Sequence, residues 1–122
     1  MKWLTHTIED ERRALERARR RFVRKPTEKR LHDVRTAGRR FRSLIEDVAD
    51  LIPASRLLRN VKKAAAATDA ARDATILREL LESNVDATES ELARPVLETL
   101  LSREHNATER ACRRLRKAAF RP

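Results

Sequence analysis

Apolar residues recur along the stretch 31–52 in alternating steps of three and four. The members of this series, called the apolar seam below, are Leu31, Val34, Gly38, Phe41, Ile45, Val48 and Ile52. Such spacing puts every member on one face of an α-helix and is the pattern by which helices pack into bundles. Thr27 can cap the start of this helix and Pro53 ends it, so we predict a helix over residues 28–51. Gly38 costs about 1 kcal/mol relative to Ala, and we expect it to permit close approach by another backbone.

Three further segments have helical periodicity. The predicted helices cover residues 7–24, 54–82 and 94–119, and the first begins with a possible capping box at Thr7 and Asp10. In the last two, we expect Leu77, Leu80, Val96 and Leu101 to face inward. Gly occurs once and Tyr is absent, while Ala and Leu make up most of the hydrophobic residues, a composition that favours helices over sheets. Short connections imply antiparallel neighbours, so the sequence predicts one all-α domain over residues 1–122, an up-down-up-down four-helix bundle.

Positive charge is concentrated in two parts of the chain. The sequence carries 29 Lys and Arg against 19 Asp and Glu, for a net charge of +10. Residues 12–42 hold 14 basic against 3 acidic residues, and residues 110–122 hold 6 basic and no acidic residues, whereas residues 43–109 are net acidic. Charge clustered in this way repels itself, so it indicates an anionic partner.

A stripe of cationic side chains runs beside the apolar seam at about 100° per residue. Its members are His32, Arg35, Arg39 and Arg42, and Arg40 lies further round. The preceding helix carries its own row, which consists of Arg13, Arg17, Arg20 and Arg24. If the two helices are antiparallel neighbours, both rows can line one channel. The planar fork of Arg binds two phosphate oxygens at once, so a repeating row of cations suits a repeating polyanion.

Other readings of this charge compete with polyanion binding. A solvated charged face is the plainest, but the stripe adjoins the core and lacks counter-charges. A nucleic-acid binder is the main functional alternative. The chain has only one Trp and three Phe on which bases could stack, which leaves non-specific duplex binding. Membrane binding through residues 7–24 is less suited, because their apolar face is thin and is needed by the bundle.

The sequence offers little for catalysis. It has no Ser-His-Asp, Cys-His or glycine-rich loop signature and no acid cluster that would hold a metal ion, so we expect no enzyme activity and no cofactor or metal. His32 could accept a phosphoryl group in principle. The single Cys112 suits a reducing compartment, and no apolar run approaches the roughly 20 residues of a membrane span. We therefore expect a soluble, cytoplasmic protein.

The stretch LHDVRTAGRRFR, residues 31–42, resembles the signature helix of the CHAD domain family, in which His-Asp-hydrophobic-Arg precedes Arg-Arg-hydrophobic-Arg. The matching positions are His32, Asp33, Val34, Arg35, Arg39, Arg40, Phe41 and Arg42. A second family landmark, an Arg-Asp pair late in the next helix, looks like Arg72-Asp73, downstream of Lys62-Lys63. This chain departs from the family pattern where Thr68-Asp69 replaces the usual Gly before that pair, and where Gly38 replaces a larger apolar residue.

The resemblance implies binding of inorganic polyphosphate and association with polyphosphate granules. With the row on residues 7–24 included, the predicted polyphosphate-binding residues are His32, Arg35, Arg39, Arg40, Arg42, Lys62, Lys63, Arg72, Arg17, Arg20 and Arg24. Asp33 and Asp73 match the motif too, and we expect them to orient neighbouring Arg side chains, because an ionised Asp cannot donate to phosphate. A full CHAD domain has two four-helix units related by a pseudo-twofold, and this chain corresponds to one half. We therefore expect a homodimer with the basic face of residues 28–51 near the twofold axis.

Overall fold

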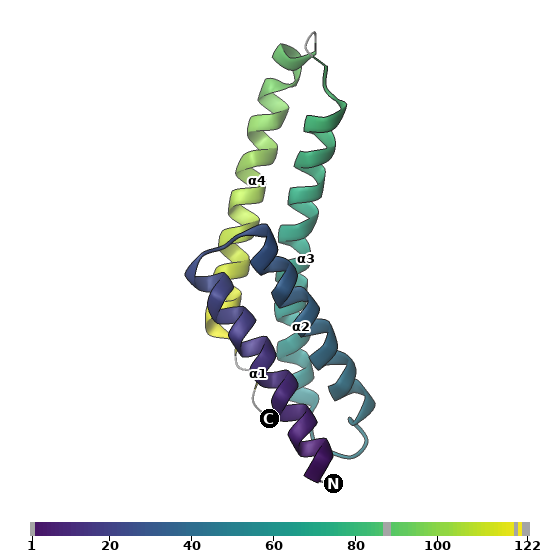
Figure 1. Cartoon of the computed structure of the whole chain (residues 1–122). Helices are drawn as coiled ribbons and strands as arrows, with labels where there is room; N and C mark the ends of the chain where they lie inside the picture. The colour runs from purple at the N-terminus through teal and green to yellow at the C-terminus, as the bar shows by residue number, and fades with distance from the viewer. Residues whose placement is uncertain (1, 87–88, 119, 121–122) are drawn as a thin grey trace.

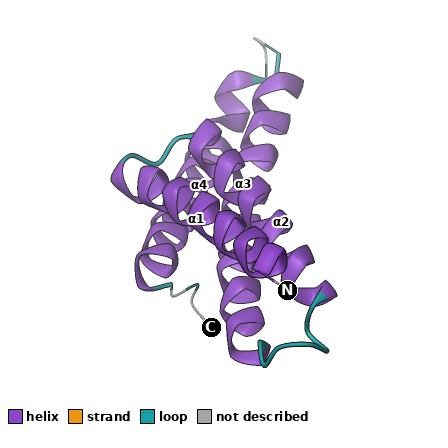
Figure 2. Ribbon diagram, turned by 60° about the horizontal axis from the view of Figure 1, so that its bottom comes forward, coloured by secondary structure: helices purple, strands orange, loops and turns teal. Residues whose placement is uncertain are grey.

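The computed structural model describes residues 2–86, 89–118 and 120. Its four helices are α1 (Lys2–Arg24), α2 (Glu28–Asp47), α3 (Ser55–Asn84) and α4 (Ser90–Lys117). Figures 1 and 2 show helices joined by short loops, and the described ranges contain no strand. Each helix packs against its neighbours in the chain, and α1 also packs against α4. The predicted all-α, four-helix fold is confirmed.

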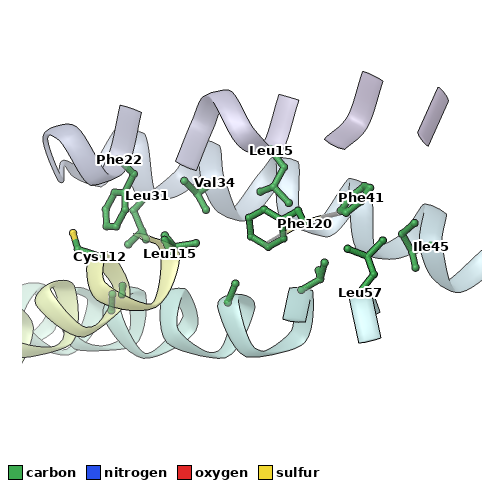
Figure 3. Close-up of a cluster of buried hydrophobic side chains, with 14 of the residues drawn as sticks. Leu15, Phe22, Leu31, Val34, Phe41, Ile45, Leu57, Cys112, Leu115 and Phe120 are labelled. Carbon is green, nitrogen blue, oxygen red and sulfur yellow. The ribbon is translucent and has the colours of Figure 1, made fainter. Parts of the chain in front are cut away.

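The core lies between the pair α1–α2 and the pair α3–α4 (Figure 3). Its fully buried side chains include Leu15 and Phe22 of α1, Phe41 and Ile45 of α2, and Leu115 of α4. The apolar seam contributes three further buried residues, Leu31, Val34 and Val48. Burial of a side chain of this size contributes about 1.5–3 kcal/mol. The seam therefore fixes which face of α2 turns inward.

The hairpin of α3 and α4 projects beyond α1 and α2 as a two-helix arm (Figure 1). We define the arm as residues 76–104. It exists because α3 has 30 residues and α2 only 20, which at 1.5 Å per residue is a difference of about 15 Å. The expectation that four apolar residues of the arm face inward is wrong, since they are between 43% and 54% exposed. These residues are Leu77, Leu80, Val96 and Leu101.

One predicted helix end and two predicted starts also need correction, since α2 ends at Asp47 and not at residue 51. Helix α1 begins at Lys2, so Thr7 lies inside it, and its hydroxyl donates a hydrogen bond to the carbonyl oxygen of Trp3 at 2.8 Å instead of capping a helix start. Helix α4 begins at Ser90, which places Pro95 in its second turn. Thr27 does cap α2, because its side chain accepts a hydrogen bond from the backbone N–H of Arg30 at 3.2 Å.

Gly38 is not a point of close backbone contact. A Cβ atom added at this position would meet only Cδ1 of Leu15 at 3.9 Å, an ordinary van der Waals distance. The expected reason for this glycine is therefore wrong. Its missing side chain instead widens a hollow between α2 and α3, described below, at the usual cost of glycine within a helix.

Arg78 ties three helices together at the base of the arm. Its side chain is 17% exposed and forms ion pairs with Glu28 of α2 at 3.6 Å, with Glu82 of α3 at 2.8 Å and with Glu104 of α4 at 2.8 Å. The hydrogen bond to Glu104 raises the pKa of Arg78 above its ordinary value. Removing one partner of an ion pair that is partly shielded from water costs more than removing one from an exposed pair, because the remaining charge loses its partner.

We predict that Arg78→Met lowers the free energy of unfolding by about 1–3 kcal/mol, because it leaves the partly buried Glu104 without its charged donor. Chemical denaturation followed by circular dichroism measures this change. The matched control is Arg94→Met, whose ion pair with Glu91 is exposed on both sides and should contribute less than about 1 kcal/mol. Equal losses in the two variants would contradict the role given to Arg78.

Candidate functional site

A hollow of about 180 Å³ opens between α2 and α3, and its floor is apolar. Val34 and Gly38 of α2 and Val61 and Ala64 of α3 form part of this floor. Its cationic wall comes from the stripe on α2, with Arg35, Arg39 and Arg42 all lining the opening. These side chains lie beside the buried seam and reach the rim over apolar atoms, as the sequence indicated. Charge interactions at such a rim are stronger than on a fully solvated face.

A second hollow adjoins the first and extends the cationic wall toward the start of α2. Its charged lining consists of Lys29, His32 and Arg35 of α2 and Arg72 of α3, together with the acidic Glu28 at the start of α2. Arg35 lines both hollows, so we treat them together as the α2–α3 groove, with the cationic set Lys29, His32, Arg35, Arg39, Arg42 and Arg72. From residue 32 to residue 42 this wall is about 15 Å long. The landmark Arg72 thus lies on the same groove as the signature helix.

The expectation that the stripe lacks counter-charges is wrong, because two of its arginines have carboxylate partners. Arg35 of α2 forms an ion pair with Asp69 of α3, and Arg42 pairs with Glu46 at 2.9 Å within α2. Arg39, in contrast, is exposed and pairs with no acid in the part of the chain that the structure describes. Among the described residues the groove therefore has two unpaired guanidinium groups, Arg39 between the two paired arginines of α2 and Arg72 on α3.

The row on α1 does not line this groove. Arg17 lines a separate hollow between α1 and α2, together with Arg21 and Arg30. Arg20 and Arg24 are exposed and line none of the hollows described here. The single channel expected from two rows does not form, because α1 buries Leu15 and Phe22 and so turns its opposite face, which carries the row, outward.

The remaining predicted residues are scattered. Arg40 and Lys62 are exposed and lie outside the groove, and Lys63 lines a different groove between α3 and α4. Asp33 lies in the hollow between α1 and α2, and Asp73 is exposed. Within the described ranges neither Asp side chain forms an ion pair or a hydrogen bond. An orienting role needs a contact with Arg, and the structure shows no such contact for either residue.

Sequence reasoning missed three residues of the site, and the first is Lys29, which lines the second hollow. Asp69 faces the groove and pairs with Arg35. The only sequence feature that pointed to Asp69 was that this chain departs from the family pattern there. Phe120 is buried beside Leu15 and lines the groove floor (Figure 3). Its position beyond the end of α4 gave no periodic pattern from which burial could be predicted.

The chemistry available in the groove is anion binding. Cationic donors repeat along one helix, and Arg side chains can hold phosphate oxygens in pairs. Burial raises the pKa of the Cys112 thiol, which makes it a poor nucleophile. In residues 2–86, 89–118 and 120 no three His, Cys, Asp or Glu side chains form a group that could hold a metal ion. Among the described helices, none is both long and apolar enough to cross a membrane.

Comparison with known proteins identifies the family. The model of the CHAD domain matches residues 6–121, nearly the whole chain. No curated protein and no solved structure was found to match. CHAD domains are binding domains, and the family is associated with polyphosphate. The matched range includes all of α2 and α3, which form the groove, and on this evidence the chain belongs to the CHAD domain family.

Proposed function

We propose that this chain binds inorganic polyphosphate in the α2–α3 groove and does not catalyse a reaction there. The observation that carries the proposal is the row of cations along one wall of a groove whose floor is apolar. A phosphate chain laid along α2 meets His32, Arg35, Arg39 and Arg42 in succession, with Arg72 facing it from α3. Family membership supports this ligand class.

Binding in this groove requires an exchange of counter-ions. Arg39 is free to take the first phosphate, whereas Arg35 must release Asp69 and Arg42 must release Glu46. Each exchange replaces one carboxylate by phosphate oxygens of a multiply charged chain, so the gain grows with the number of phosphates engaged. A long polyanion therefore benefits more than a single phosphate.

The other predicted residues remain predictions. Arg40, Lys62, Lys63, Arg17, Arg20 and Arg24 lie outside the α2–α3 groove, so they would contact the same polyphosphate only where it runs past the groove. Targeting of the protein to polyphosphate granules is the cellular consequence that we propose. Non-specific duplex binding is the alternative, because phosphate contacts alone would support it as well.

We also propose a homodimer, as the two-unit architecture implied by the resemblance suggests, and the position of the basic face of α2 near its twofold axis stays a prediction. Two features of the arm support a second copy as its partner. Its exposed leucines are a surface that another protein could cover. Residues 76–104 also carry seven acidic against three basic residues, while the rest of the chain is strongly basic. The arm of one copy is thus complementary in charge to the body of another.

We predict that replacing both Arg35 and Arg39 by Ala weakens polyphosphate binding about tenfold or more near physiological salt, because two charge-assisted contacts are lost. A titration of labelled polyphosphate measures the affinity. The control Lys25→Ala with Arg94→Ala removes the same charge from exposed positions outside the groove and should change affinity less than about threefold. Equal losses, or competition by duplex DNA phosphate for phosphate, would support a general charged surface instead.

A change at Asp69 should strengthen polyphosphate binding, in contrast to the changes at Arg35 and Arg39. We predict that Asp69→Asn strengthens polyphosphate binding, because it releases Arg35 from its internal counter-ion. Asp73→Asn makes the same change in net charge four residues along α3, at an exposed site without an ion pair, and is the matched control. The same titration applies to both. If Asp73→Asn strengthens binding as much as Asp69→Asn does, only net charge matters.

For the homodimer, we predict that Leu77→Glu combined with Leu80→Glu converts a dimer into a monomer in sedimentation velocity at tens of micromolar. Leu51→Glu alters an exposed leucine of the α2–α3 connection, away from the arm, and should leave the dimer intact. A wild-type chain that sediments as a monomer at this concentration would contradict the proposed dimer.

A further inference from the structure

A second cationic groove lies between α3 and α4. It has a volume of about 600 Å³ and is larger than either hollow of the α2–α3 groove. Its cations are Lys63 of α3 and Arg110, Arg113, Arg114 and Lys117 of α4. This α3–α4 groove contains most of the basic run at residues 110–122, which the α2–α3 groove leaves unused.

The electrostatics of this groove differ from those of the first. All five cations are exposed, and no acidic residue lines the groove. In the described part of the chain none of the five forms an ion pair or hydrogen bond. Arg35 and Arg42, in contrast, are already paired in the α2–α3 groove. An anion entering the α3–α4 groove displaces no internal counter-ion.

The floor of the α3–α4 groove is made of alanines. Ala66, Ala67 and Ala70 of α3 and Ala107 of α4 line it. Because their side chains end at Cβ, the cations rise above the floor on both sides and a linear anion can lie between them. The lining contains no aromatic side chain on which a nucleic-acid base could stack, which favours an anion without bases.

The two grooves lie on opposite faces of α3. Val61, Ala64, Ala65, Thr68 and Asp69 line the α2–α3 groove, whereas Lys63, Ala66, Ala67 and Ala70 line the α3–α4 groove. At about 100° per residue the two sets are centred roughly half a turn apart. Helix α3 therefore separates the two grooves, and one short anion cannot occupy both.

We propose that the α3–α4 groove binds a second segment of polyphosphate, so that one protein molecule bridges two polyphosphate segments. This inference rests on the proposed function for its ligand class. The α4 cations extend from residue 110 to residue 117, about 10 Å along the helix, which suits several successive phosphates better than a single one. Two opposed sites on one chain would let the protein draw separate polyphosphate strands together, whether or not the chain forms a dimer.

The test is the number of binding sites per chain. Isothermal titration uses a short inorganic polyphosphate with too few phosphates to pass around α3 from one groove to the other. We expect two sites per chain for the wild type and one for Arg110→Gln with Arg113→Gln. Lys63→Gln, on the opposite wall, should weaken the same site. Circular dichroism checks that each variant stays helical, and Lys25→Gln with Arg94→Gln is the charge-matched control, which should keep both sites.

The outcomes separate this inference from the proposed function. One site in the wild type, lost on Arg35→Ala with Arg39→Ala and unaffected by the α4 variant, overturns the second site and leaves the proposed function standing. If Arg110→Gln with Arg113→Gln abolishes all binding, while Arg35→Ala with Arg39→Ala loses no binding, the proposed function is overturned instead. Displacement of the short polyphosphate from the α3–α4 groove by duplex DNA, phosphate for phosphate, also overturns the inference, because the groove is then a general anion surface.

Discussion

Burial of the apolar seam of α2 is the constraint on which the site depends. The seam packs Phe41 and Ile45 into the centre of the core, and this fixes the rotation of the helix about its own axis. Residues 32, 35, 39 and 42 lie immediately beside the seam, so the same rotation brings them to the edge of α3. The cationic wall of the α2–α3 groove is therefore a geometric consequence of the packing, and no loop or flexible segment is needed to build it.

The chain manages its positive charge differently in different places. On α2, ion pairs with Asp69 and Glu46 neutralise Arg35 and Arg42, which lowers the repulsion within the stripe. On the outer faces of α1 and α4 the cations are exposed to water, where repulsion is screened. A groove with internal counter-ions is stable without ligand but must exchange them on binding. A groove without counter-ions avoids that exchange and depends on solvent and salt until a ligand is bound.

The unequal lengths of the helices give the molecule its second distinctive feature. Helices α3 and α4 extend past α1 and α2, and Arg78 links α2, α3 and α4 where the arm begins. Beyond that point the hairpin has leucines without cover and an excess of acidic residues, while the body of the protein is basic. Along α3 and α4, the basic body thus gives way to an acidic arm with exposed leucines. The two ends of the molecule therefore have different surfaces for interaction.

The sequence by itself determined the helices, the buried face of α2 and the cationic stripe next to it, because each is a local pattern repeated every three or four residues. It also carried the family resemblance, which lies in consecutive residues of one helix. Only the tertiary structure decided which stripes share a groove. It kept the α1 row out of the α2–α3 groove, paired Arg35 with Asp69, brought α4 beside Lys63 and buried Phe120. These relations join residues far apart in the chain, or depend on which side of a helix a neighbour covers, and helical periodicity within one segment contains no information about either.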